Sequence, residues 1–293
     1  MDPIRKLIAL LLSLFGLVPT VPLSTQTLPP AQAQTHSLTV MSYNVYVVDD
    51  LIHSHDRRAP GVVHTIRAEM PDVFCLQEAN ADWMERISSA MPEYAYVGRG
   101  RDPGDNAGEF SPVFYNTERF TLSDGGTFWF SDTPDTPSRT WLSRYRRICS
   151  WAVLQETGSG FTFAVFNSHW DHLSVVSRNR SARLLLQKAA VLAPDMPVVL
   201  TGDFNCKENT VAYETLIDAG FADCRYCAAE TCDLGSFHSY LRSDTAGERS
   251  IDHILFDDRY AAADTFRVIT DKYDGMYPSD HFAIAAGLRL YQP

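Results

Sequence analysis

Apolar, β-type runs that end abruptly in polar side chains constrain the fold of this chain more than any other feature. The clearest run, residues 198–200, leads into Thr201-Gly202-Asp203-Phe204-Asn205. A glycine permits a tight turn at that point, and Asp203 and Asn205, two residues apart, then project from the same side. Short apolar runs of this kind predict buried strands. Because functional side chains gather beyond strand ends, the sequence predicts a site there.

The same β-type pattern recurs along the chain, with turn residues between the runs. Strands are expected at residues 37–48, 72–77, 108–115, 148–155, 161–169, 197–201, 251–256 and 282–290. Helical spacing of apolar residues predicts helices at 60–70, 174–192 and 211–219. Since strands outnumber helices and helices connect only some of them, we expect an α+β or sandwich-like α/β fold with sheets stacked inside and helices outside.

The first 33 residues have the pattern of an export signal. Arg5 and Lys6 precede an apolar run at residues 7–18, and Ala31-Gln32-Ala33 has the small-x-small form of a cleavage site. The run is short for a membrane span, although an uncleaved anchor is the alternative. We therefore expect a signal peptide at 1–33, a folded domain at 34–293, and a secreted or periplasmic protein without stable membrane insertion.

The charge balance weakens the case for an enzyme that holds long nucleic-acid duplexes. The formal net charge is −11, and no block of Lys and Arg is present beyond the modest stretches at 144–147 and 178–183. Proteins that grip a duplex present a basic face. The sequence favours a monomer that acts on a phosphorylated small molecule or a short nucleic acid.

Six cysteines are present, and three of them lie close together. Cys75 falls within an apolar run, which predicts a core position. Cys224, Cys227 and Cys232 predict a local disulfide in an exported protein, with the pairing open. A zinc site is the weaker interpretation, because no second pair has the required spacing.

Other strand ends carry acids, amides or imidazoles as well. Each one has an ordinary structural explanation, such as an amide bonded to backbone or a solvated carboxylate. The aspartate at 252 lies in a β-branched strand, and a buried charge needs a partner, either a histidine or an arginine. Taken together, the ordered set predicts one convergent site: Asn44, Glu78, His169, Asp203, Asn205, Asp252, Asp280 and His281.

Those residues, in that order, resemble the endonuclease/exonuclease/phosphatase superfamily, and the closest likeness is to a bacterial secreted branch. The most specific matches are the segment from Thr201 to Asn205 and Ser279-Asp280-His281-Phe282. The resemblance runs from Met41 to the C-terminus. It implies a four-layer α/β sandwich, in which two packed mixed β-sheets are flanked by helices, and a phosphoesterase that depends on Mg²⁺ or Mn²⁺.

The resemblance also implies roles for the strand-end residues. Glu78 would be the main metal ligand, with Asn44 beside the metal or phosphate and Asp280 as a further acid. His169 and Asn205 would donate hydrogen bonds to phosphoryl oxygens. Asp203 would orient and help to deprotonate the attacking water, and Asp252 would pair with His281. Such a set neutralises the charge that builds up during phosphoryl transfer.

Several positions and functions stay open. Glu109 and Arg147 are candidates for substrate contact, and structural ion pairing explains each equally well. Trp170 is expected to pack in the core, and His253 to face away from Asp252. A sphingomyelinase-like lipid phosphodiesterase would need an exposed aromatic projection, for which Phe128-Trp129-Phe130 is a weak candidate. A non-catalytic binding module on the same fold is the remaining alternative.

Overall fold

The computed structural model describes residues 34–104, 106–240 and 250–292, and everything below concerns these residues. The chain divides into two units, 1–33 and 34–293. The first unit, with the expected export signal, lies outside the described residues. Within the described ranges, no helix combines the length and hydropathy that a membrane crossing requires.

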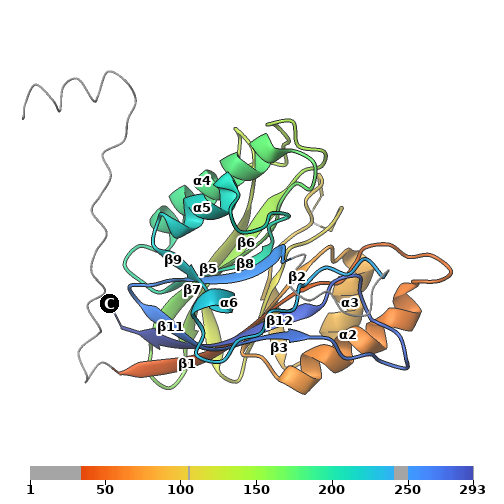
Figure 1. Ribbon diagram of the computed structural model, residues 1–293, viewed down its shortest axis with the longest axis horizontal. Helices are drawn as coiled ribbons and strands as arrows, with labels where there is room; N and C mark the ends of the chain where they lie inside the picture. The colour runs from red at the N-terminus through yellow and green to blue at the C-terminus, as the bar shows by residue number, and fades with distance from the viewer. Residues whose placement is uncertain (1–33, 105, 241–249, 293) are drawn as a thin grey trace, which may run out of the picture. The chain divides into compact units, whose positions relative to one another are not determined.

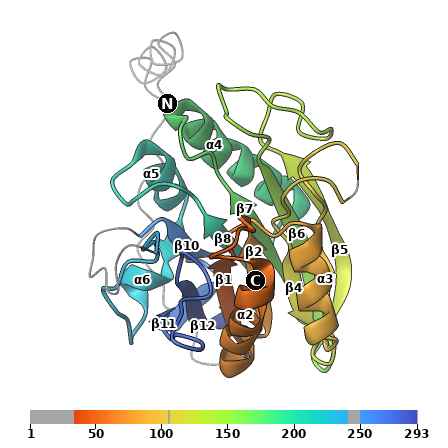
Figure 2. The ribbon, with the colours of Figure 1, turned by 90° about the vertical axis from the view of Figure 1, so that its right-hand side faces the viewer.

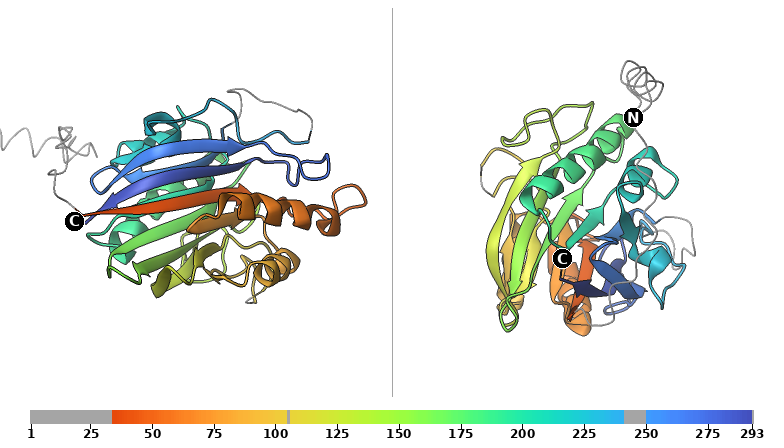
Figure 3. Two further views of the ribbon diagram at one scale, coloured as in Figure 1. Left: turned by 90° about the horizontal axis from the view of Figure 1, so that it is seen from below. Right: turned by 90° about the vertical axis from the view of Figure 1, so that its left-hand side faces the viewer.

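The first sheet is mixed and has the strand order β11-β12-β1-β2-β4-β3. Its strands are β1 (Thr35–Asn44), β2 (Val73–Gln77), β3 (Tyr94–Val97), β4 (Val113–Asn116), β11 (Ala261–Ile269) and β12 (Ala283–Tyr291). Only β1 and β2 pair in parallel. The left panel of Figure 3 shows β11 and β12, in blue, beside the red β1.

The second sheet is also mixed, with the order β5-β6-β7-β8-β10-β9. Its strands are β5 (Phe120–Trp129), β6 (Ile148–Glu156), β7 (Thr162–His169), β8 (Val198–Asp203), β9 (Phe221–Asp223) and β10 (Asp252–Asp257). Here β7 and β8 form the one parallel pair. The two sheets therefore each contain a single parallel pair within an otherwise antiparallel arrangement.

Helices make the crossovers that the parallel pairs require, because parallel strands cannot be joined by a tight turn. The described helices are α2 (His55–Glu69), α3 (Ala81–Ala90), α4 (Val175–Leu192), α5 (Val211–Ile217) and α6 (Cys224–Cys227). The connection from β1 to β2 contains α2, and that from β7 to β8 contains α4. Ser174 caps α4 by accepting a hydrogen bond from the Ser177 amide.

Three apolar clusters separate four layers. The central cluster joins the facing sides of the two sheets, from Leu38 and Val40 to Val165 and Ile254. A second cluster packs α4 and α5 on the second sheet, and a third packs α2 and α3 on the first. Figures 1 and 2 show these two helix pairs on opposite sides of the strands. The four-layer α/β sandwich is confirmed.

Burial along β1 follows from these layers. Residues alternate between exposed and buried at its start and are all buried from Val40 to Asn44. Met41 and Tyr43 pack in the cluster that contains Val62 and Ile66 of α2. Strands covered on both faces lose their polar alternation, which is why the site end of β1 is a continuous buried run.

The structure corrects several predicted boundaries. The first strand ends at Asn44 instead of 48, because Tyr46 has a φ of 59° that breaks the extended chain. The helix expected at 60–70 begins at His55. The strand expected at 108–115 is reduced to β4. Sequence reasoning did not identify α3, α6, β3, β5, β9 or β11.

The expected local disulfide is absent, and all six cysteines are free thiols. Cys224 points into the central cluster, whereas Cys227 is exposed and its thiol donates to the Asp223 carbonyl. The two therefore face different surroundings. Cys75 is fully buried, as predicted.

Candidate active site

The two parallel strand pairs bring the predicted polar residues to one end of the sandwich. Asn44 pairs with Gln77, the residue before Glu78, at the ends of β1 and β2. His169 pairs with Asp203 at the ends of β7 and β8. The two sheets meet there, since Asn44 Nδ2 donates to Glu78 Oε1 and to Asp203 Oδ2, each at 3.1 Å.

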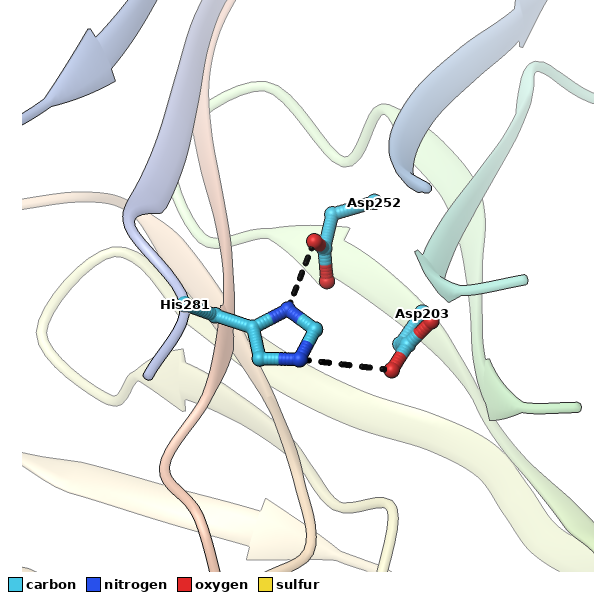
Figure 4. Close-up of side chains that lie close together, drawn as sticks. All are labelled: Asp203, Asp252 and His281. Atoms are coloured by element: carbon cyan, nitrogen blue, oxygen red, sulfur yellow. Dashed lines mark hydrogen bonds and ion pairs between the residues drawn. The ribbon is translucent and has the colours of Figure 1, made fainter. Parts of the chain in front are cut away.

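Antiparallel neighbours bring the remaining acid and imidazole groups to the same end. Asp252 begins β10 opposite Asp203, and Asp280 and His281 precede β12. His281 lies between the two aspartates (Figure 4): its Nδ1 is 2.8 Å from Asp252 Oδ2, and its Nε2 is 3.9 Å from Asp203 Oδ2. The three side chains form a buried acid–imidazole–acid group.

Glycine is required beside Asp203. Gly202 has a φ of 142°, and a Cβ at this position would lie 1.9 Å from the Ser168 carbonyl oxygen on the neighbouring strand. Any larger residue would push β8 away from β7. The turn that ends β8 therefore fixes where the Asp203 carboxylate lies.

Burial and neighbouring charge give the central groups unusual protonation. Burial and then the charge of Asp252 raise the pKa of Asp203 to about 7, although His281 opposes the rise. Burial lowers the pKa of His281, but Asp252, Asp203 and Asp280 outweigh it and raise the pKa to about 10. An imidazolium thus lies beside a carboxyl group that titrates near neutral pH.

His169 is the neutral imidazole of the site. Its Nε2 lies 3.4 Å from Asp203 Oδ2. Burial, followed by the charges of Arg147 and Arg101, holds the pKa of His169 well below its ordinary value. His169 can therefore donate one hydrogen bond without carrying charge, whereas His281 carries a proton on both nitrogens.

Glu78 and Asp280 form a more open acidic side of the site. Both are only partly buried. Glu78 has a φ of 60° and accepts a hydrogen bond from the Val47 amide at 2.9 Å. Burial is the main reason that the pKa of Asp280 rises to about 6, and the charge of Glu78 adds to it, while His281 opposes it. Two neighbouring hard oxygen donors of this kind fit a divalent cation.

A second group could also hold a cation on geometry alone. Ligand atoms of Asp203, Asp252 and His281 lie within 4.8 Å of one another. Because the raised pKa of His281 leaves both ring nitrogens protonated, the ring offers no lone pair. A cation in this group would have to displace a ring proton, so we expect the group to serve proton chemistry and the Glu78–Asp280 side to hold the cation.

Sequence reasoning missed the residue that positions the acidic side. Arg58 of α2 is fully buried. Its guanidinium donates to five backbone carbonyls: those of Val45, Tyr46, Val48, His53 and Pro278. It thus ties the loop after β1, which binds Glu78, to the segment before Asp280. Nothing in the local sequence distinguishes this arginine from one on a helix surface.

Asn205 lies just outside this central group. Its φ is 48°, its amide N–H donates to Asp203 Oδ1, and its side-chain Nδ2 donates to the Trp170 carbonyl at 3.0 Å. These bonds brace the Asp203 carboxylate. The contact of Asn205 with a phosphoryl oxygen, which the sequence predicted, stays a prediction.

Glu109 and Arg147 border the site next to His169. Glu109 forms a two-pronged ion pair with Arg101, at 2.6 and 2.7 Å, and lies 3.9 Å from His169 Nδ1. Arg147 is buried 3.9 Å from Asp171, and its Nε and Nη1 have no hydrogen-bond partner among the described residues. Substrate contact and structural ion pairing therefore both stay open for Glu109 and Arg147.

Trp170 and His253 have the structural positions that the sequence predicted. Trp170 is fully buried and stacks on Phe204 with ring centroids 4.3 Å apart. His253 faces away from the site, with Nδ1 2.9 Å from Asp223 and Nε2 2.9 Å from the Cys206 carbonyl.

Comparisons with known proteins agree with this fold. A family model described as "Endonuclease/Exonuclease/phosphatase family" matches residues 41–281. A solved structure of a family protein from Bacteroides thetaiotaomicron is 32% identical, with a TM-score of 0.83, over 87% of this chain and 98% of that one. A mannosyl-6-phosphatase from the same species is also 32% identical, with a TM-score of 0.82, over 86% and 99%.

Curated relatives are longer than the matched region. An uncharacterised protein of Acanthamoeba polyphaga mimivirus is 29% identical over 58% of this chain and 66% of its own length. Drosophila melanogaster Nocturnin is 22% identical over 79% of this chain, which covers only 41% of that protein. The family model spans most of the chain and the residues of the site. The chain therefore belongs to the endonuclease/exonuclease/phosphatase family, whose enzymes hydrolyse phosphoester bonds.

Proposed function

We propose that this protein is a divalent-cation-dependent phosphoesterase that hydrolyses a phosphodiester or phosphomonoester by direct attack of water. One observation carries the proposal: the Asp203 carboxylate lies within 3.9 Å of two imidazoles and within hydrogen-bond distance of Asn44, which also binds Glu78. A general base (Asp203), two imidazole donors and the acidic side that would hold the cation are thus close together. Phosphoryl transfer needs these groups around one phosphate.

The proton chemistry follows from the raised pKa values. Asp203, whose pKa is raised to about 7, orients a water and accepts its proton as the oxygen attacks phosphorus. Protonated His281 and neutral His169 donate hydrogen bonds to the phosphoryl oxygens as their charge grows. Asp252 holds the His281 ring through Nδ1, at 2.8 Å, and so acts as a positioning residue.

Glu78 and Asp280, with Asn44 beside them, would hold Mg²⁺ or Mn²⁺. When bound, such an ion supplies positive charge that stabilises the phosphoryl oxygens and the leaving group. Hydrogen bonds from the Val47 amide and the Asn44 side chain hold the Glu78 carboxylate in place for the cation.

The comparisons support a phosphomonoester among the substrates, since one of the similar structures is that of a mannosyl-6-phosphatase. The lipid alternative loses its specific candidate, because Phe128, Trp129 and Phe130 are all buried and offer no membrane-facing projection. The binding-module alternative is less favoured, because the strand-end acids and imidazoles lie together at one end of the sandwich.

Hydrolysis of bis-p-nitrophenyl phosphate and p-nitrophenyl phosphate tests the proposal. The protein from residue 34 onward would be assayed with Mg²⁺, with Mn²⁺ and with EDTA, beside Asp203→Ala and His281→Ala. We expect turnover that EDTA and both substitutions abolish. A folded, metal-loaded protein that cleaves neither compound, nor a panel of natural phosphoesters, would contradict it.

The expected export of the protein is a separate proposal. Expression of the full chain in a bacterial host, followed by mass determination of the exported protein, would show cleavage after Ala33. Recovery of only the full-length chain in the membrane fraction would support the uncleaved anchor.

A further inference from the structure

A cavity adjoins the proposed active site on the side of Glu109. Its volume is about 440 Å³, and its polar lining residues are Asn80, Asp82, Arg101, Asp102, Asn106 and Glu109. Val47, whose amide binds Glu78, also lines it. Arg101 and Glu109 further border the small recess that contains His169. A group attached to a phosphate in the active site would thus extend into this cavity.

The lining has a distinct chemical character. It combines carboxylates, amides and one guanidinium, and none of the described residues that line it is aromatic. A nucleobase usually binds by stacking on a ring, and a quaternary ammonium usually binds in an aromatic cage. A lipid chain needs apolar walls. The cavity suits none of these three groups.

The two aspartates are held in place with acceptor capacity left over. Asp82 Oδ2 lies 2.6 Å from His55 Nδ1 and 2.7 Å from Arg86 Nε. Asp102 Oδ1 accepts from Arg146 Nη1 at 2.9 Å. Their side chains are 43% and 41% exposed, so part of each carboxylate group faces solvent.

The charges of the lining are already balanced by partners. Arg86 pairs with Asp82, Arg146 with Asp102, and Arg101 with Glu109. What remains is hydrogen-bonding capacity: carboxylate oxygens that accept, and amides that both accept and donate. Neutral hydroxyl groups match such a lining better than a second phosphate or an amine does.

Asp102 has two close contacts with residues 107 and 108. Gly108 has a φ of 77°, and a Cβ there would lie 2.5 Å from Asp102 Oδ2. Asp102 N also donates to the Ala107 carbonyl at 3.0 Å. These contacts and Arg146 restrict the Asp102 side chain, and such restriction reduces the entropy lost on binding.

We propose that this cavity binds a neutral polyhydroxyl group, a sugar or polyol, that carries the phosphate to be hydrolysed. Asp82 and Asp102 would accept hydrogen bonds from its hydroxyls, with Asn80 and Asn106 beside them. This inference rests on the proposed phosphoesterase function and narrows its substrate class.

The test compares hexose 6-phosphates with n-hexyl phosphate, a monoester of a primary alcohol without further hydroxyls. The kcat/KM of metal-loaded wild type would be measured for glucose 6-phosphate, mannose 6-phosphate and n-hexyl phosphate. We expect at least one hexose phosphate to be preferred, and Asp102→Ala to reduce that preference about 10-fold, mainly through KM, as the loss of one charge-assisted hydrogen bond would.

Arg146→Ala is the matched control, because it breaks the same ion pair but keeps the Asp102 carboxylate. It should leave the preference unchanged. An equal loss in the two variants, or no preference for either hexose phosphate, would overturn the inference while the proposed function stands. No hydrolysis of any ester by the wild type would refute the proposed function itself.

Discussion

Two buried aspartate–histidine pairs start from adjacent residues of β10 and point to opposite faces of the second sheet. Asp252 pairs with His281 at 2.8 Å, and His253 pairs with Asp223 at 2.9 Å. The carboxylate outweighs the effect of burial in both, so the pKa of each histidine is raised. The residue types, the distances and the burial are nearly the same.

The second ring nitrogen distinguishes the pairs. Nε2 of His253 lies 2.9 Å from the Cys206 carbonyl, so the ring is satisfied on both sides within the core. Nε2 of His281 faces Asp203 at 3.9 Å, too far for a hydrogen bond. A buried Asp–His pair therefore indicates chemistry only when one nitrogen remains available for a substrate.

The largest expected effect separates the two histidines. His281→Gln should lower kcat for p-nitrophenyl phosphate by about 10³-fold, since a charged donor is lost, and should also lower stability, because the buried Asp252 loses its partner. His253→Gln should keep kcat but destabilise the fold by about 3 kcal/mol, because the buried Asp223 loses its partner. Steady-state kinetics and denaturant unfolding would measure the two effects. Similar losses of kcat in both variants would contradict the distinction between a catalytic His281 and a structural His253.

A smaller effect is expected from the partner aspartates. Asp252→Asn should lower kcat about 10- to 100-fold, because His281 keeps its place but loses the charge that favours its protonated form. Asp223→Asn is the matched control and should lower stability alone. If Asp252→Asn left both kcat and its pH dependence unaltered, Asp252 would have no positioning role.

The protonation states can be measured directly. In metal-free protein at pH 8, nitrogen NMR should find His281 protonated on both nitrogens, since its pKa is raised to about 10, and His169 neutral, since its pKa is lowered. The stability that the raised pKa of His281 contributes is complete below its ordinary pKa and is lost as pH rises through about 10. A neutral His281 at pH 8 would contradict this account.

The smallest expected effect is that of a substitution at Glu156, which contacts the end of β1 that lies away from the site. Glu156 contacts His36, Arg119 and Ser159. Burial raises the pKa of Glu156, but these hydrogen bonds outweigh it and lower the pKa to about 2. The resulting stability is present above the ordinary pKa of a glutamate and is lost as pH falls toward 2. Glu156→Gln should lower Tm by a few degrees at pH 7 but not at pH 2, without changing kcat.

The sequence predicted the layers and the site because both depend on local patterns. Phosphoryl chemistry needs acids, amides and imidazoles at strand ends, and they interrupt apolar runs visibly, as Glu78 and Asp203 do. The boundary residues Asn44 and His169 stood out for the same reason. The predicted hydrogen bond between Asp252 and His281 is present at 2.8 Å.

The features that were missed lack such patterns. Strand β11 has a register shift between Ala263 and Thr265, and β5 has one between Leu122 and Asp124. Each shift disturbs the alternation that identifies a strand. Strand β9 has three residues, too few to show a period. The role of Arg58 depends on carbonyls far apart in the chain and appears only when the chain is folded.

Titration with Mn²⁺ tests the central division between the cation side and the proton side most directly. Calorimetry would measure binding to the wild type, Glu78→Gln and Asp203→Asn. The account predicts that Glu78→Gln weakens Mn²⁺ binding at least 10-fold, while Asp203→Asn binds within a few fold of the wild type and is nearly inactive. Loss of binding in Asp203→Asn with retention in Glu78→Gln would place the cation among Asp203, Asp252 and His281, and would contradict the account.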